Sequence, residues 1–165
     1  MAYAKSDKLH IVTAVAVIRR DDGRILLLKR REDETVYPGH YTFPGGKVEG
    51  NDTISKTLVK EVKEECGLSL EPGFILIKEK AIGRSDGQTS KSLSFLCVVK
   101  DTEAVSIDEK DFTDFTWASV EELRALPHVG IEAEFIKTSE ISNSHCDPRP
   151  FFIDTDQVDF RNSVT

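Results

Sequence analysis

The stretch that decides the fold is GGKVEGNDTISKTLVKEVKEECGL, which runs from Gly45 to Leu68. Its second half carries three carboxylates on one short segment, Glu61, Glu64 and Glu65. Like charges one turn apart destabilise a helix by about 0.2–0.5 kcal/mol per pair. Crowded glutamates are therefore unfavourable unless something outside the helix compensates their charge.

A helix is predicted to begin near Ile54 and to end at Gly67. Asp52 or Thr53 suits its N-cap, and glycine is common just after the last turn. Apolar side chains recur every four residues, so one stripe faces the core: Ile54, Leu58, Val62 and Cys66. The segment thus packs one side against the protein and leaves the rest for polar groups.

The acidic residues of this helix form an edge beside the apolar stripe. At about 100° per residue, Glu61 and Glu65 lie within roughly 40° of each other, and Glu64 lies on the adjoining flank. One interpretation is a solvated amphipathic helix with Lys60 and Glu64 as an ordinary pair. The position next to the core, directly after a glycine-rich loop, favours a second interpretation. Carboxylates that repel one another alone become favourable around Mg²⁺ or Mn²⁺, with substrate phosphates completing the shell.

This stretch resembles the Nudix box, whose pattern is GX5EX7REUXEEXGU with U aliphatic. The matching positions are Gly46, Asp52, Lys60-Glu61-Val62, Glu64-Glu65 and Gly67-Leu68. The preceding loop FPGG, from Phe43 to Gly46, is also similar to that of the family. Two positions depart from the pattern, since Asp52 replaces the usual Glu and Lys60 the usual Arg, but neither change removes a charge. The chain is therefore identified as a MutT-like Nudix hydrolase.

The resemblance implies a role for each box residue. Glu61, Glu65 and Glu64, with the carbonyl of Gly46, are expected to hold Mg²⁺ (or Mn²⁺). The general base is either a box glutamate, Glu61 or Glu64, or a carboxylate from a distant loop. Of the loop candidates Glu109, Asp111 and Asp114, Asp111 is our first choice, and its alternative is a solvated loop acid. Four box positions are expected to be structural: Gly46, Asp52, Lys60 and Gly67.

The substrate contacts are expected from residues ahead of the box. Arg30 ends a strand near the loop and is suited to phosphates. Tyr37, Tyr41 and Phe43 either stack on a base or pack the loop. For the sites we select Arg30, Tyr41 and Phe43.

The expected function is metal-dependent hydrolysis of a pyrophosphate bond in a nucleoside diphosphate linked to another group. The first hypothesis is a nucleoside triphosphate, oxidised or not, giving a nucleoside monophosphate and pyrophosphate. The alternatives are a pyrophosphatase for ADP-ribose, dinucleoside polyphosphates or nucleotide sugars, and a catalytically idle nucleotide-binding module. No proline occurs between Pro72 and Pro127, where ADP-ribose-cleaving members carry one. A domain with no enzymatic role and an accidental box is a further alternative.

The rest of the chain predicts an α/β fold, a mixed sheet with helices packed on it in a Nudix-type α/β/α sandwich. We expect one domain over residues 1–140 and a C-terminal tail over residues 141–165 that is partly disordered or lies on the surface. The turn Asp22-Gly23 predicts a hairpin of two partner strands. The expected strands are His10–Arg20, Arg24–Arg31, Phe74–Gly83, Ser92–Lys100 and Phe112–Ala118, and further helices begin at Ser119 and span Ile131–Glu140.

Composition limits the partners. The net charge of -7 over 165 residues argues against a non-specific grip on nucleic acid, which needs a basic surface. Three scattered cysteines suggest a reducing compartment, and no apolar stretch approaches the roughly 20 residues of a membrane span. We expect a cytoplasmic protein, monomeric or homodimeric, that binds a small nucleotide and no membrane.

Overall fold

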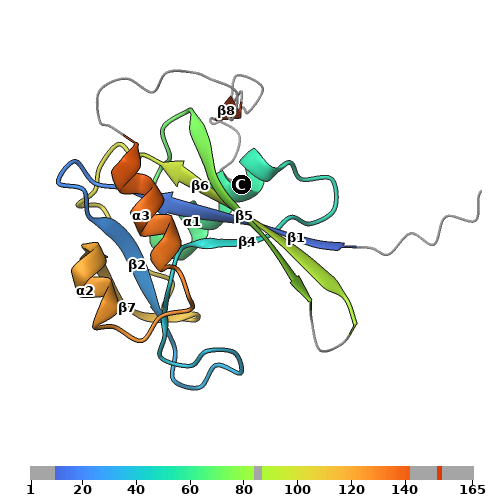
Figure 1. Ribbon diagram of the computed structural model, residues 1–165, viewed down its shortest axis with the longest axis horizontal. Helices are drawn as coiled ribbons and strands as arrows, with labels where there is room; N and C mark the ends of the chain where they lie inside the picture. Colours follow the sequence, from blue (N-terminus) through green and yellow to red (C-terminus); the bar gives the residue numbers. More distant parts are fainter. Residues whose placement is uncertain (1–9, 84–86, 142–151, 154–165) are drawn as a thin grey trace, which may run out of the picture.

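The computed structural model describes residues 10–83, 87–141 and 152–153, and its strands form two sheets (Figure 1). A mixed sheet has the order β4 (Gly45–Lys47), β1 (His10–Ile18), β6 (Thr89–Cys97), β5 (Phe74–Gly83), β8 (Phe152–Ile153). An antiparallel sheet has the order β3 (Tyr41–Thr42), β2 (Ile25–Arg30), β7 (Phe112–Ala118). The helices are α1 (Ile54–Cys66), α2 (Val120–Arg124) and α3 (Glu132–Glu140).

The fold class predicted from the sequence is confirmed, but the strands divide into two sheets where one was expected. The predicted hairpin of β1 with β2 is also wrong. Both edges of β1 are already occupied, by β4 antiparallel and by β6 parallel. The turn itself forms, since the N–H of Gly23 donates to the carbonyl of Arg20 at 2.9 Å, and one bridge joins Arg19 to Ile25. The chain then leaves the first sheet, and β2 pairs with β3 and β7 in the second.

The predicted strands Phe74–Gly83 and Ser92–Lys100 are both observed, as β5 and β6, and together they form a hairpin. β5 and β6 pair antiparallel over nearly their whole length, and β6 begins at Thr89 rather than at Ser92. Its parallel register with β1, from His10 opposite Thr89 to Ile18 opposite Cys97, accounts for the earlier start. At the other side of β5, Phe74 and Ile75 pair with β8. Apart from Ile141 and β8, the tail expected at 141–165 lies outside the described residues.

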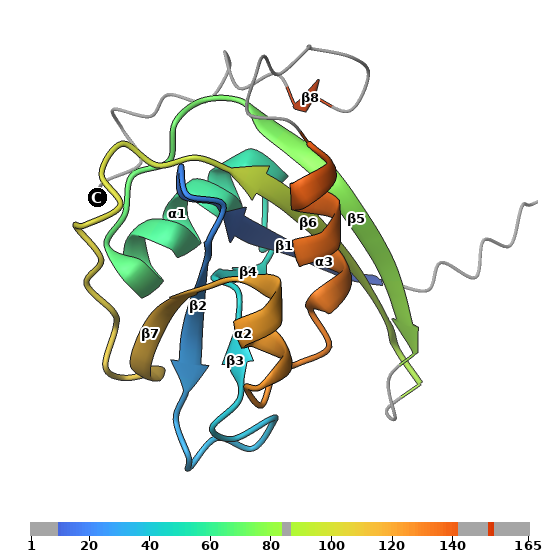
Figure 2. The same cartoon turned by 60° about the vertical axis from the view of Figure 1, so that its left-hand side comes forward.

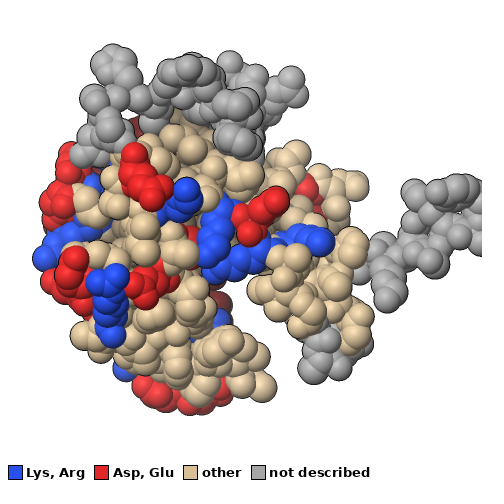
Figure 3. Space-filling model, in the orientation of Figure 1, with Lys and Arg blue, Asp and Glu red and all other residues tan. Residues whose placement is uncertain are grey.

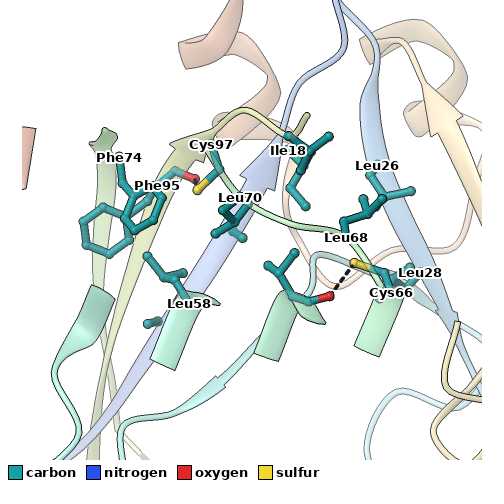
Figure 4. Packing of buried hydrophobic residues seen from close by; sticks show 14 of the residues in the cluster. Ile18, Leu26, Leu28, Leu58, Cys66, Leu68, Leu70, Phe74, Phe95 and Cys97 are labelled. Carbon is teal, nitrogen blue, oxygen red and sulfur yellow. Dashed lines mark hydrogen bonds between the residues drawn. The ribbon is translucent and has the colours of Figure 1, made fainter. Parts of the chain in front are cut away.

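The alternation of side chains along β2 places this strand between two layers of helix. Leu26 and Leu28 join the core under α1, whereas Ile25 and Leu27 join a second cluster under α2 and α3. Figure 4 shows the first of these cores, in which Leu58 and Cys66 of α1 approach the strands. In Figure 2, α1 lies on one side of β1 and α3 on the other. This is the expected sandwich of helices around strands.

The helix ends follow their sequence signals. Thr53 caps α1 by accepting from the N–H of Lys56 at 3.1 Å, and Gly67 ends the helix with φ +70°. The helix predicted to begin at Ser119 is α2, and Ser119 and Glu122 form a capping box at its start. None of the helices in the described residues is long and apolar enough to cross a membrane.

One charged side chain lies almost entirely inside the protein. Glu134 of α3 is 1% exposed. Its carboxylate lies 2.7 Å from Nζ of Lys80 and 3.8 Å from Nζ of Lys78, both on β5. Ser94 Oγ adds a long hydrogen bond at 3.5 Å. Since a buried carboxylate is tolerated when it is paired, this contact ties α3 to the mixed sheet.

Candidate active site

Two of the crowded glutamates turn toward the glycines of β4. The backbone N–H of Gly45 donates to Oε2 of Glu65 at 2.8 Å. At Gly46, a Cβ atom would lie 2.5 Å from the carboxyl carbon of Glu61. A side chain at this position would push the carboxylate of Glu61 aside, whereas glycine leaves room for it. The FPGG loop and α1 are therefore fitted to each other at Glu61 and Glu65.

Burial and neighbouring acids both act against negative charge at this place. Burial is the largest cause that raises the pKa of Glu65, to about 8 from 4.5, and the charges of Glu61 and Asp111 add to it. The N–H of Gly45 and the charge of Arg30 oppose this shift. The pKa of Glu61 is raised as well, first by burial. Both carboxylates would be stabilised as anions by an added cation.

The donor set fits a hard divalent cation. Glu61 and Glu65 are half-buried, carry carboxylate oxygens and lie beside the backbone of Gly46. Within residues 10–83, 87–141 and 152–153, no group of three or more His, Cys, Asp or Glu side chains lies close enough to hold an ion by itself. Mg²⁺ commonly binds through one or two carboxylates and completes its shell with water and phosphate oxygens. Two carboxylates and a nearby backbone thus suit a metal that arrives with a phosphate substrate.

Glu64 is placed differently from its two neighbours. Its side chain is exposed, whereas Glu61 and Glu65 are half-buried. Its charge reaches Glu61 and contributes to the raised pKa of that carboxyl group. The flank position predicted from the helical periodicity is observed.

The segment between β6 and β7 brings Asp111 to the glutamates. Its backbone N–H groups satisfy two carbonyls at the end of α1, from Ser106 to Cys66 at 3.0 Å and from Asp108 to Glu65 at 2.9 Å. A tight turn follows, in which the N–H of Asp111 donates to the carbonyl of Asp108 at 3.1 Å. The side chain of Asp111 is exposed, and its charge raises the pKa of both Glu61 and Glu65.

The two departures from the box pattern do not pair with each other. Asp52 forms an ion pair with Lys56, in the first turn of α1, at 2.6 Å between Oδ1 and Nζ. This contact lowers the pKa of Asp52. Lys60 acts on Asp52 and on Glu61 only through its charge, which lowers the pKa of each. Lys60 therefore opposes part of the shift at Glu61.

The substrate-contact candidates occupy three different environments. Arg30 donates to the carbonyl of Val36 at 2.9 Å and to Glu34 at 3.1 Å, so its guanidinium is engaged with the loop after β2. Tyr41 is half-buried, and burial followed by the charge of Asp114 raises the pKa of its hydroxyl.

Phe43, the third candidate, lies in the core. Its side chain is 5% exposed and stacks on Phe135 with ring centroids 5.9 Å apart. The sequence left two alternatives for this ring, stacking on a base or packing inside the protein. Its buried position agrees with packing, and the ring presents almost no surface to a ligand.

Two groups at the site were not assigned from the sequence. The N–H of Gly45 is the hydrogen-bond donor to Glu65. The only indication of this role in the sequence is that Gly45 directly precedes Gly46, the first glycine of the box. The exposed acid Glu49 acts on Glu61 and helps to raise its pKa. Glu49 lies in the loop between Gly46 and α1, and its position in the box was the only indication.

Comparison with known proteins agrees with this geometry. Residues 9–138 match the family model described as the NUDIX domain. The chain is 33% identical over 120 residues to Nucleoside triphosphatase NudI of Escherichia coli. The matched region covers 67% of this chain and 84% of that relative.

Solved structures show the same fold. A MutT NUDIX hydrolase from Burkholderia pseudomallei superposes with a TM-score of 0.67 at 23% identity, over 82% of this chain and 100% of that one. The NUDIX domain of NrtR from Shewanella oneidensis, solved with ADP ribose, gives 0.64 at 16% identity, over 83% and 90% of the two chains. Since the family model spans most of the sequence and a relative above 30% identity covers two thirds of it, the protein belongs to the Nudix hydrolase family.

Proposed function

We propose that the protein hydrolyses nucleoside triphosphates to nucleoside monophosphates and pyrophosphate. The observation that carries the proposal is the pair Glu61 and Glu65, half-buried against the glycines of β4 with no ion pair among the described residues. The name of the relative at 33% identity, a nucleoside triphosphatase, supports this substrate class.

Glu61 and Glu65 are the proposed protein ligands of Mg²⁺ or Mn²⁺, with Glu64 and the carbonyl of Gly46 as further contacts. When bound, the ion neutralises phosphate charge and withdraws electrons from the phosphorus that is attacked. The N–H of Gly45 holds one oxygen of Glu65 in place. That hydrogen bond leaves the other carboxylate oxygen, Oε1, free to bind the ion.

Asp111 is the proposed general base. Its carboxylate takes a proton from the attacking water as the water oxygen bonds to the α-phosphorus. The bond from that phosphorus to the bridging oxygen breaks, and pyrophosphate leaves with its electron pair. The exposed side chain of Asp111 lets water reach it, while its backbone is fixed by Asp108.

The rest of the proposal concerns the whole chain. We propose that the protein acts on a small nucleotide and not on a nucleic-acid polymer, and that it is a monomer or homodimer in the cytoplasm. Cys66 and Cys97 are free and buried, which agrees with a reducing compartment. The proposed division is a catalytic domain over residues 1–140 and a C-terminal segment over residues 141–165, of which β8 pairs with β5 of the mixed sheet.

A second candidate is an ADP-ribose pyrophosphatase. It is favoured by one observation, the structural likeness to the NrtR domain that was solved with ADP ribose. At 16% identity this likeness shows the fold alone, so the triphosphate remains the first proposal.

The test incubates the protein with nucleoside triphosphates, ADP-ribose or dinucleoside polyphosphates, with Mg²⁺ and with Mn²⁺. The nucleotide products are then separated by chromatography, since the expected products are a nucleoside monophosphate and pyrophosphate or a sugar phosphate, not free phosphate. Glu64→Gln and Glu65→Gln are compared with Glu121→Gln, an exposed glutamate of α2 that serves as the matched control. We expect turnover of triphosphates by the wild type and the control, and a large loss in Glu65→Gln. Turnover on none of these compounds would exclude the hydrolase. Full activity in both Glu64→Gln and Glu65→Gln would exclude the metal assignment.

A further inference from the structure

The loop between β2 and β3 ends in an apolar tip that faces solvent. Val36 is 57% exposed and Tyr37 is 56% exposed. A tyrosine ring presents a large flat face whose burial is favourable. Acidic residues dominate the first part of the loop, which leaves the tip as its apolar part: Glu32, Asp33 and Glu34.

The backbone at the tip is strained. Tyr37 has φ +50°, and among the described residues no other side chain besides glycine adopts a positive φ. It also precedes Pro38, where the extended region is preferred. A bulky residue in this conformation persists only when its surroundings fix it, and such outliers cluster at functional sites.

Three hydrogen bonds fix this conformation. Nε of Arg30 donates to the carbonyl of Val36 at 2.9 Å. The N–H of Gly39 donates to the carbonyl of Arg31 at 3.2 Å, and the N–H of His40 donates to that of Tyr37 at 3.3 Å. The ring of Tyr37 is thereby presented outward, beside the imidazole of His40 at 5.7 Å between centroids and an angle of 57°.

The base of the same loop is attached to the carboxylate site. The N–H of Arg31 donates to the carbonyl of Asp111 at 3.3 Å, and its guanidinium donates to the carbonyl of Glu109 at 3.1 Å. Arg30, which holds the tip, also acts on Glu65 through its charge. The exposed ring thus belongs to a loop whose base is hydrogen-bonded to the segment that carries Asp111.

The surface is hollowed next to this loop. In Figure 3 a hollow separates the lobe at the bottom, which the β2–β3 loop forms in Figure 1, from the β5–β6 hairpin.

We propose that Tyr37 is the stacking platform for the nucleobase of the substrate, with His40 beside it. The inference deepens the proposed function and rests on it, since the loop that carries Tyr37 is bonded to the Asp111 segment beside the proposed phosphate site. An aromatic ring recognises the face of any base, so this contact contributes affinity and little discrimination among bases. A protein ligand on the same tip is the competing outcome.

The test measures the Kd of an α,β-methylene nucleoside triphosphate and the Kd of inorganic triphosphate, both with Mn²⁺. Tyr37→Ala removes the ring, Tyr37→Phe keeps it, and Val36→Ala is the matched control that removes apolar surface from the same loop. We expect Tyr37→Ala to weaken the nucleotide by about ten- to a hundredfold, as for other base-stacking aromatics. Tyr37→Phe and Val36→Ala stay within about threefold of the wild type, and inorganic triphosphate binds all four proteins alike. Thermal unfolding checks that each variant is folded.

The outcomes separate this inference from the proposed function. Equal nucleotide affinity in Tyr37→Ala and wild type, with turnover intact, overturns the platform alone. Ring-dependent nucleotide binding without turnover on any nucleotide overturns the hydrolase and leaves the platform. If Tyr37→Ala loses as much affinity for inorganic triphosphate as for the nucleotide, Tyr37 supports the phosphate site and the platform is overturned. If neither the wild type nor Tyr37→Ala binds the nucleotide, the platform is overturned as well.

Discussion

Glu134 and the pair Glu61 and Glu65 are carboxylates held inside one fold, yet their charges are balanced by different means. Glu134 has Lys80 at 2.7 Å and Lys78 at 3.8 Å, so the chain supplies its own cations. For Glu61 and Glu65, the described residues offer one backbone N–H and more distant charges, with no ion pair. A carboxylate compensated from within holds the structure together, whereas one left uncompensated is available to an ion from outside.

The largest expected effect comes from removing the uncompensated charge. Glu65→Gln should lower kcat for nucleoside triphosphates by about a hundred- to a thousandfold, the usual loss when one electrostatic contact of a transition state is removed. Without metal and at a pH above about 8, where Glu65 is ionised, the stability of the variant should equal or exceed that of the wild type, because a buried charge is gone. Steady-state pyrophosphate release and urea unfolding measure the two quantities. A variant that is both active and unstable would place Glu65 in the structural class with Glu134.

The opposite pattern is expected at the compensated site. Lys80→Met leaves Glu134 buried with the longer contact to Lys78 and should lower the free energy of unfolding by about 3 kcal/mol. The kcat should change little, since this pair lies in α3 and β5 and not at the β4 glycines. Adding Glu134→Gln to Lys80→Met should restore most of the stability, because no buried carboxylate is then left, and Lys78 is partly exposed to water. Urea unfolding of the two variants decides this, and a double variant as unstable as Lys80→Met would contradict it.

An added cation should act on only one of the two sites. Mn²⁺ should raise the thermal midpoint of the wild type, by an amount that corresponds to about 2.7 kcal/mol at a hundred times its Kd. The shift should persist in Lys80→Met and be largely lost in Glu65→Gln. Differential scanning fluorimetry against EDTA measures it. A shift of equal size in Glu65→Gln would mean that the ion binds elsewhere.

A last expected effect is on the pH dependence of stability without metal. The pKa of Glu65 is raised in the folded state, to about 8 from 4.5, so the folded protein binds this proton more tightly than the unfolded chain. The stability that the folded protein gains from this bound proton is fully present below about pH 4.5 and is lost as the pH rises toward about 8. Unfolding in EDTA should therefore show stability that falls across this window, and Glu65→Gln should flatten the fall. With Mn²⁺ present the trend should reverse, since the ion displaces the proton.

The comparison also explains what the sequence was able to predict. Glu61, Glu65 and the glycines before them lie within one stretch, so spacing and helical periodicity placed them on one edge of one helix. Glu134 is different, because its partners Lys78 and Lys80 lie more than fifty residues earlier, on a strand. No local pattern connects them, and an acid in a short helix is expected to face water.

The strand pairing failed for a similar reason. Asp22-Gly23 marks a turn, and the turn is present, but a turn does not state which strands pair. The edges of β1 were taken by β4 and β6, which come from later in the chain. Phe43 shows the same limit on a smaller scale, because its stacking partner Phe135 is distant in sequence.

The attachment of the β6–β7 segment to α1 has a consequence for the history of such a protein. Its bonds run from the N–H groups of Ser106 and Asp108 to the carbonyls of Cys66 and Glu65, so backbone holds backbone. Side chains along the segment can then be exchanged over generations while Asp111 stays near the glutamates. Variation in this part of the chain can retune the chemistry of Asp111, the proposed proton acceptor, without rebuilding the helix that carries the proposed metal ligands.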